Sequence, residues 1–207
     1  MRDMSTRSNR HVIIEGPDGA GKSTVVKYLS TITDTPVARR ISDSITGVKG
    51  KDLQAYVNQD MGEWANYASA DPQVNKSAYS SFHTPRASHI YDRYPLISEP
   101  IYGLHVRKSP QPAFLTTWYR DKWREFLAHD PLIIWCLPPY DEVAKHVHPE
   151  RDMDGVWRNL LPLYRAYTFA ALTYPGTSVI YDYTRDEPGG FSEPGDLVNL
   201  VSRHFEQ

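Results

Sequence analysis

A glycine-rich stretch near the N-terminus has the residue types and the spacing needed to hold a chain of phosphates. In IIEGPDGAGKST, residues 13–24, Gly16, Gly21, Lys22 and Ser23 fill every fixed position of the pattern G-x-x-x-x-G-K-[ST]. Glycines let backbone N–H groups converge on phosphate oxygens, and the start of the following helix adds its positive end. The residues predicted to bind the nucleotide are Gly16, Pro17, Gly19, Ala20, Gly21, Lys22, Ser23 and Thr24.

Two side chains of this loop have expected chemical roles. Lys22 would reach the outer phosphates, and the Ser23 hydroxyl would ligate Mg²⁺. ATP and Mg²⁺ are therefore the predicted cofactors. The loop alone does not separate a kinase from a nucleotide-hydrolysing switch or motor, because all of them hold phosphates in this way.

A second group of polar residues follows another apolar stretch. HIYDRYPLISEPIYG, residues 89–103, places Asp92, Arg93 and Tyr94 at the end of a predicted strand, with Ser98 and Tyr102 after it. In open α/β sheets, ligands bind beside the carboxyl ends of the strands. We therefore expect this group to lie at the ligand site, although a plain surface ion pair is the alternative for the Asp-Arg pair.

Together, these two motifs resemble the signatures of the thymidylate kinase-like group of P-loop kinases, whose second motif reads D-R-[YH]-x-x-S-x-x-A-Y. DPLIIWCLPPYDEV is similar to the family's strand followed by P-P-x-x-V, and YRAYTFAAL is similar to the helix after the family's lid. The resemblance runs from Arg10 to Asp182. It implies a phosphotransferase, and a phage-type relative of the family is one form this could take.

The resemblance implies roles for individual residues. Asp18 occupies the place of an acid that contacts the acceptor sugar, although aspartate also caps such turns. Asp92 resembles the acid that organises Mg²⁺ through water, so Ser23 and Asp92 are the implied metal residues. Arg93 resembles an arginine that clamps the acceptor or its phosphate. The acceptor-binding residues implied on this side are Asp18, Arg93, Tyr94, Ser98 and Tyr102, of which Tyr94 is equally suited to packing.

Two further groups of arginines are implied to reach the acceptor or the transferred phosphoryl group. Residues 146–158, HVHPERDMDGVWR, sit where the family keeps a mobile lid, and lid arginines spread the charge of the phosphoryl group. Arg151 is the first candidate and Arg158 the second, with solvated charges on a polar loop as the alternative. Arg39 and Arg40 end the second predicted strand, where the family presents an arginine to the acceptor phosphate. The implied catalytic residues are Lys22, Asp18, Asp92, Arg93 and Arg151.

The chain departs from the family pattern in two places. Members that phosphorylate thymidylate carry a phenylalanine and an A-x-R segment on a helix before the Asp-Arg-Tyr strand. Here Phe82 and Arg86 are separated by Pro85, which disfavours a helix running into the strand. Gly19 stands where some members place a catalytic arginine. Both departures leave the identity of the acceptor open.

The acceptor decides which chemistry the site needs. A nucleoside monophosphate offers an oxygen that is already anionic, so its phosphorylation requires charge neutralisation but no general base. A hydroxyl must lose its proton to a carboxylate, for which Asp18, Asp92 and Glu99 are candidates. We expect a deoxynucleotide kinase. The alternatives are a kinase that phosphorylates a modified thymine, such as 5-hydroxymethyluracil in phage DNA, and a nucleotide-binding regulator. In the DNA alternative, aromatic and basic side chains at 118–124 would hold the strand, unless they form the core face of a helix.

Apolar runs alternate with amphipathic stretches along the chain. This pattern predicts strands at 11–15, 35–41, 88–92, 131–137 and 177–182, and helices at 22–29, 52–68, 113–127, 141–147, 157–172 and 193–205. Such alternation predicts an α/β fold, a three-layer sandwich with an about five-stranded parallel sheet. The resemblance implies that this fold is of the P-loop NTPase type. The resemblance adds a small helical lid.

Composition limits the remaining possibilities. The 207 residues suit one domain, 1–207, with 1–9 as a loosely ordered lead-in. A formal net charge of −2 gives no general attraction to DNA, so any such contact must be local. Cys136 lies in an apolar run and is expected to be a core residue. No apolar run reaches the length of a membrane span, so we expect a cytoplasmic protein, in the host cytoplasm if it comes from a phage. Family members often pair, which implies a homodimer.

Overall fold

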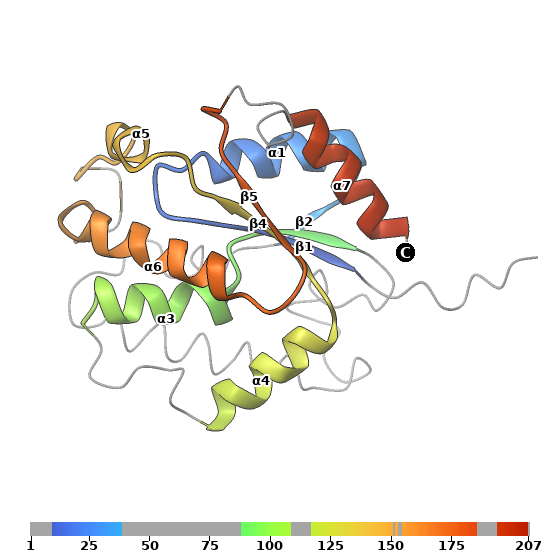
Figure 1. Cartoon of the computed structure of the whole chain (residues 1–207), viewed down its shortest axis with the longest axis horizontal. Coiled ribbons are helices and arrows are strands. Elements are labelled where there is room, and N and C mark those ends of the chain that lie inside the picture. The colour runs from blue at the N-terminus through green and yellow to red at the C-terminus, as the bar shows by residue number, and fades with distance from the viewer. Residues whose placement is uncertain are drawn as a thin grey trace, which may run out of the picture.

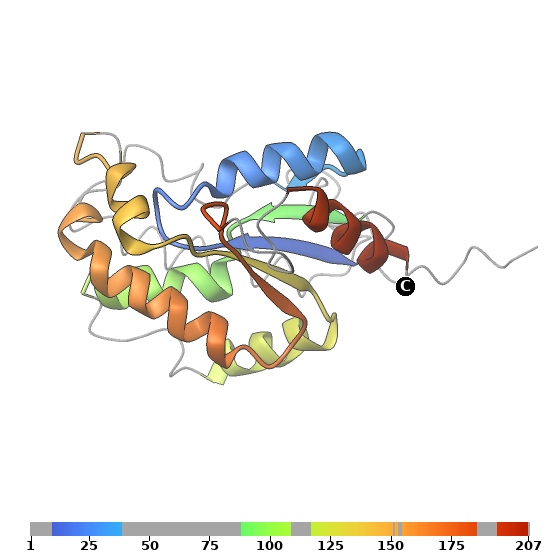
Figure 2. The same cartoon turned by 45° about the horizontal axis from the view of Figure 1, so that its top comes forward.

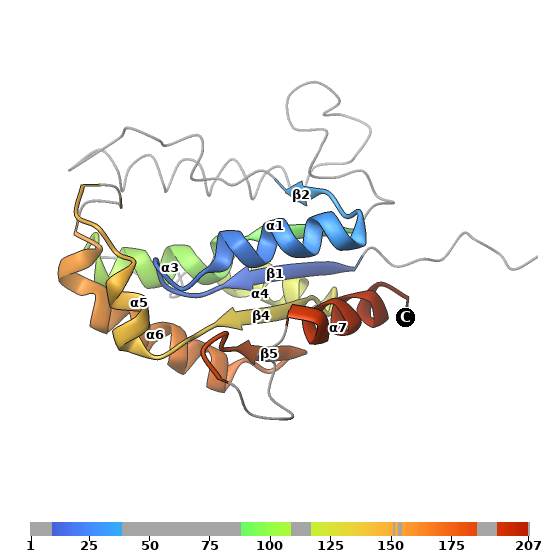
Figure 3. The ribbon, with the colours of Figure 1, turned by 90° about the horizontal axis from the view of Figure 1, so that it is seen from above.

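The structure is a computed structural model that describes residues 10–38, 88–108, 117–150, 152, 155–185 and 194–206. Within these ranges, five strands form one parallel sheet in the order β2-β3-β1-β4-β5. The strands are β1 (His11–Glu15), β2 (Val37–Ala38), β3 (His89–Asp92), β4 (Leu132–Cys136) and β5 (Ser178–Tyr181). The predicted parallel sheet is confirmed. Figure 3 shows β1, β4 and β5 following one another across it.

Helices cover both faces of the sheet. They are α1 (Lys22–Thr33), α3 (Pro95–His105), α4 (Thr117–Ala128), α5 (Tyr140–Lys145), α6 (Leu160–Thr173) and α7 (Pro194–Glu206), with a short 3₁₀ helix at Trp157–Asn159. Helices α1 and α7 pack together on one face, and α3, α4 and α6 lie on the other (Figures 1 and 2). The three-layer sandwich is therefore confirmed. No helix among the described residues is long and apolar enough to cross a bilayer.

The central strands explain why the two motifs meet. Strand β1 lies between β3 and β4, and β4 is buried at all five positions, as its continuous apolar run predicts. Ile14 in β1 pairs with Asp92 in β3. Because both strands end at the same edge, the loop after β1 lies beside the turn after β3. Cys136 is fully buried at the end of β4, as expected for a core thiol.

Helix α3 begins within the second motif and was not among the predicted helices; its sequence contains two prolines. Pro95 is compatible with a first helical turn, which needs no N–H donor. Pro100 lies inside the helix and leaves the carbonyl of Leu96 without its usual donor. The Tyr119 hydroxyl of α4 donates to that carbonyl instead. A contact from a distant helix therefore compensates for the proline.

Other differences concern element ends. Helix α1 extends beyond the predicted 22–29, β2 begins at Val37 rather than at residue 35, and the predicted helix 157–172 is divided into a 3₁₀ turn and α6. Residues 39–41 of the predicted second strand lie outside the described residues. Pro162 lies in the first turn of α6, where a proline is tolerated. The predicted helix at 52–68 and the lead-in at 1–9 lie outside the described residues.

Candidate phosphate-binding and acceptor site

The phosphate loop connects Glu15, the last residue of β1, to Lys22, the first residue of α1. Gly16 has a φ of 143°, and a Cβ atom on it would collide with the backbone carbonyl of Cys136. Gly21 has a φ of 79°, in the left-handed region, immediately before α1. Both conformations favour glycine. The backbone path into the helix start, where anions are favoured, therefore requires the two fixed glycines.

Lys22 is buried beneath this loop. Its Nζ donates a hydrogen bond of 2.5 Å to the carbonyl of Pro17. Burial and, after it, the nearby Arg93 cation lower the pKa of Lys22 to about 7, against the attraction of Asp18 and Glu15. Negative charge placed in the loop would hold the lysine in its charged form. Lys22 is thus positioned as a cation for a phosphate group.

Ser23 and Asp92 meet across the boundary between α1 and β3. The Ser23 hydroxyl donates to Asp92 Oδ2 at 3.1 Å, and both residues border a cavity of about 350 Å³. A hydroxyl and a carboxylate are the hard oxygen ligands that Mg²⁺ prefers. No group of three or more His, Cys, Asp or Glu side chains with metal-binding geometry occurs in the described ranges. The pair therefore fits Mg²⁺ only together with phosphate oxygens and water.

Asp18 and Arg93 are at the centre of a polar network beside the loop. Arg93 Nη2 donates to Asp18 Oδ1 at 2.7 Å, and Arg93 Nη1 donates to the carbonyl of Gly16 at 3.0 Å and to the Tyr167 hydroxyl at 2.5 Å. The Tyr102 hydroxyl donates to Asp18 Oδ2 at 2.5 Å. The structure thus brings the predicted residues Asp18, Arg93 and Tyr102 together.

Asp18 and Arg93 both stay charged within this network. Burial by itself would raise the pKa of Asp18, but Arg93, Lys22 and the hydrogen bond from Tyr102 outweigh it, so the pKa is lowered. Burial likewise disfavours the Arg93 cation, yet its acidic and phenolic neighbours raise its pKa well above the ordinary value. Arg93 pairs with Asp18 rather than with Asp92, and its side chain is 18% exposed. The surface ion pair considered from the sequence is therefore wrong.

Comparisons with known proteins address the fold. No protein-family model matches the chain, and no curated protein matches it. Among solved structures, the chain is similar to YorR from Bacillus subtilis in complex with phosphorylated GDP, with a TM-score of 0.55 and 16% identity over 95% of this chain and 98% of that one. It is also similar to thymidylate kinase from Candida albicans, with a TM-score of 0.55 and 16% identity over 98% and 93% of the two chains. The chain has the fold of the P-loop nucleotide kinases.

A further similar structure supports this fold. Deoxyadenosine kinase from M. mycoides with bound dATP has a TM-score of 0.51 and 14% identity, over 95% of this chain and all of that one. These structures cover nearly the whole chain at low identity. They agree with the resemblance of the sequence motifs to P-loop nucleotide kinases.

Two buried residues of the site, Glu15 and Tyr167, were not predicted from the sequence. Glu15 is fully buried, and its Oε1 accepts the backbone N–H of Tyr94 at 2.6 Å. Burial raises the pKa of Glu15 to about 7, although Arg93, the bond from Tyr94 and Lys22 act in the opposite direction. An acid ending an otherwise apolar strand is the signal that could have identified it. Tyr167 had no comparable signal, because tyrosines also fill helix cores.

Tyr94 and Ser98 lie close to the network but serve packing and helix formation. The Tyr94 ring stacks on Phe126, with ring centres 4.7 Å apart, and meets Tyr91 edge-on. The Ser98 hydroxyl donates to the backbone carbonyl of Tyr94 at 3.2 Å. The structure shows neither side chain in contact with Asp18, and their role in acceptor binding stays a prediction.

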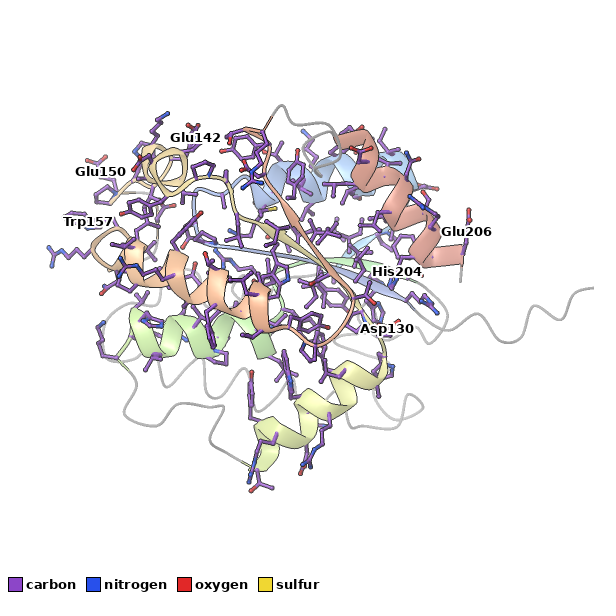
Figure 4. All side chains as sticks on the ribbon, in the orientation of Figure 1. Asp130, Glu142, Glu150, Trp157, His204 and Glu206 are labelled. Atoms are coloured by element: carbon purple, nitrogen blue, oxygen red, sulfur yellow. The ribbon has the colours of Figure 1, made fainter. Side chains whose placement is uncertain are left out.

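Of the remaining predicted arginines, only Arg158 lies within the described residues. Arg158 is exposed, with its guanidinium 5.3 Å from the ring centre of Trp157. Figure 4 shows Trp157 and Glu150 at the same rim of the molecule. Arg39, Arg40 and Arg151 lie outside the described residues, so that only part of the predicted lid at 146–158 is described.

The described aromatic side chains of α4 pack against one another. The rings of Tyr119 and Trp123 are stacked with centres 6.2 Å apart, and Trp123 also stacks on Phe126 at 5.2 Å. Arg124 pairs with Asp121 on the exposed side of the helix. For the side chains that are described, the core interpretation of this helix is therefore correct.

Proposed function

We propose that this chain is an ATP- and Mg²⁺-dependent kinase that transfers the γ-phosphoryl group to a deoxynucleotide. The observation that carries the proposal is the bonding of Asp18 to both Arg93 and Tyr102 directly beside the phosphate loop. A nucleotide-binding regulator has no need of a polar cluster at this position. The similar folds of a thymidylate kinase and a deoxyadenosine kinase support a nucleotide acceptor.

The donor side follows from the loop. The glycine turns and the start of α1 would hold the phosphates, and the Lys22 ammonium would neutralise charge that develops on the transferred group. Ser23 and Asp92 would hold Mg²⁺, which would supply positive charge beside the phosphates. Arg151 and Arg158 are proposed to add cations from the lid, and Arg39 or Arg40 to contact the acceptor phosphate.

The acceptor side favours a group that is already anionic. Asp18 has a lowered pKa and two hydrogen-bond donors, so it is a weak base that suits binding a sugar hydroxyl better than removing its proton. Glu15 has a pKa of about 7 but is fully buried behind the backbone of Tyr94. A phosphate acceptor needs neither residue as a base. These electrostatics support a deoxynucleoside monophosphate over a hydroxyl of a modified thymine.

Phosphate transfer can be tested directly. Purified protein would be incubated with γ-labelled ATP, Mg²⁺ and, in separate reactions, deoxynucleoside monophosphates, deoxynucleosides and DNA containing 5-hydroxymethyluracil. We expect label on a deoxynucleoside monophosphate. Label on DNA alone would replace the proposal with the modified-thymine kinase, and slow release of labelled phosphate with no labelled acceptor would indicate a regulator.

A further inference from the structure

Arg93 has a backbone conformation that its surroundings must maintain. Its φ is 71°, in the left-handed region, which costs a residue with a Cβ about 1 kcal/mol or more. Its N–H donates to the carbonyl of Ile14 at 3.0 Å, and the next N–H, of Tyr94, donates to Glu15 at 2.6 Å. These bonds hold the backbone, but they do not determine where the guanidinium points.

Three acceptors determine the direction of the guanidinium. Gly16 and Asp18 belong to the phosphate loop, and Tyr167 belongs to α6; Nη1 donates to Gly16 and Tyr167, and Nη2 donates to Asp18. Tyr167 is thus the one member of the three that lies outside the loop. A planar guanidinium that donates to three acceptors through two nitrogens cannot rotate without losing at least one bond.

Tyr167 is held firmly enough to act as a fixed support. Its side chain is fully buried, and its ring meets the Tyr102 ring edge-on, with centres 6.4 Å apart. The Arg93 guanidinium lies 4.9 Å from the centre of the Tyr102 ring and 5.8 Å from that of Tyr167. Burial raises the pKa of Tyr167 well above 10 despite the nearby arginine, so its hydroxyl stays neutral at working pH.

We propose that Tyr167 is a positioning residue for the acceptor, whose hydroxyl holds Arg93 so that Nη2 faces Asp18. This inference rests on the proposed kinase function. Without the hydroxyl, one N–H of a buried cation lacks its partner. The guanidinium then turns toward other acceptors and weakens its bond to Asp18.

The test compares two substitutions on the same helix. Tyr167→Phe removes the hydroxyl and keeps the ring. Tyr164→Phe is the matched control, because the Tyr164 hydroxyl donates to the carbonyl of Pro138 and not to the network. We expect Tyr167→Phe to raise the KM for the acceptor deoxynucleotide about five- to tenfold and to change the KM for ATP less than about twofold. Tyr164→Phe should leave both values within about twofold.

Two outcomes would overturn the inference. One is an unchanged acceptor KM in Tyr167→Phe. The other is an equal rise in both KM values, which would indicate a general structural role. Equal effects of Tyr167→Phe and Tyr164→Phe on the acceptor KM would also indicate a general structural role and overturn the inference.

A second measurement separates this inference from the proposed function. In protein with ¹⁵N-labelled arginine, Nη1 and Nη2 of a held guanidinium give separate signals. The Arg93 signals should be separate in the wild type and in Tyr164→Phe, and merged in Tyr167→Phe. If the wild type phosphorylates no acceptor, the proposed function fails, and these spectra still decide the role of Tyr167. Separate Arg93 signals in the wild type, Tyr164→Phe and Tyr167→Phe would overturn the inference that Tyr167 holds the guanidinium.

Discussion

The two ends of the parallel sheet bury polar groups in different surroundings. At the carboxyl end, Asp18 and Arg93 are held as ions, each with its pKa shifted toward the charged form. At the amino end, the buried His204 has a lowered pKa, because burial disfavours its imidazolium and Arg10 repels it. Figure 4 shows His204 and Asp130 at this end, far from Trp157. Burial shifts the pKa of His204, and of Glu15 and Lys22 at the carboxyl end, toward the neutral form, whereas Asp18 and Arg93, which bond each other directly, keep their charges.

Neighbouring side chains account for the difference. The first residues of β1 and β3, His11 and His89, are paired in register, with ring centres 6.1 Å apart. His11 also meets the Tyr91 ring edge-on at 5.4 Å. This end is thus lined with aromatic rings, whereas the carboxyl end combines a lysine, an arginine and two acids. We expect substitutions to affect catalysis at the carboxyl end and stability alone at the amino end.

The largest effect is expected from Lys22→Ala. It removes the cation beneath the phosphate loop, so phosphoryl transfer should fall at least about a hundred- to a thousandfold. Steady-state kcat with saturating acceptor is the measurement. Lys145→Ala is the control, because Lys145 pairs with Glu142 on the surface and should be near wild type. Retention of more than a tenth of the activity by Lys22→Ala would contradict the assignment of the carboxyl end as the donor site.

Arg93→Lys should come next in magnitude. Lysine keeps the charge but cannot bond Gly16, Asp18 and Tyr167 together, so kcat/KM for the acceptor should fall about tenfold to a hundredfold. The KM for ATP should change little. Arg107→Lys is a matched control, since Arg107 forms another largely buried ion pair, with Glu99, away from the loop. Equal kinetic losses in both variants would show that burial of an arginine, rather than its place in the network, matters.

Asp18→Asn should have a moderate effect that identifies the chemistry. If Asp18 binds a sugar hydroxyl, the acceptor KM should rise about tenfold with kcat nearly unchanged. Because the pKa of Asp18 is lowered, wild-type acceptor binding should not depend on this group from pH 6 to 8, and should weaken only as acid protonates it. A severe loss of kcat would instead indicate base chemistry and favour the hydroxyl acceptor.

The smallest expected effect is on stability, with opposite signs at the two ends. Glu15 has a pKa raised from 4.5 to about 7, so the folded state holds its proton more tightly and this contribution is lost as pH rises between these values. His204 has a lowered pKa, so the unfolded state takes up its proton first and stability is lost as pH falls below about 6.5. Urea midpoints from pH 5 to 8 measure both slopes.

Single substitutions separate the two contributions to the pH dependence. Glu15→Gln should reduce the loss between pH 4.5 and 7, and His204→Asn should reduce the loss below pH 6.5. His129→Asn, at an exposed position, is the control and should reproduce the wild-type profile. If Glu15→Gln and His204→Asn change the profile in the same direction, the contrast between the two ends is incorrect.

The sequence predicted correctly those features that depend on residues close together in the chain. β1 was predicted at its observed bounds, and the phosphate loop followed from glycine spacing, because a tight turn into a helix depends on backbone freedom at fixed positions. Helix α3 was missed, because Pro100 argues against a helix until Tyr119 from α4 is seen to satisfy the free carbonyl. That partner lies on another element and has no signature in sequence.

The sequence by itself determined the phosphate loop, the alternation of strands and helices, and the Asp-Arg-Tyr motif at a strand end. Only the tertiary structure decided that Arg93 bonds Asp18 and Tyr167 rather than its neighbour Asp92, and that Glu15 holds the backbone of Tyr94. The physical reason is that backbone preferences act within a few residues. The charge state of a buried side chain is set instead by groups that the order of the strands brings within hydrogen-bond reach.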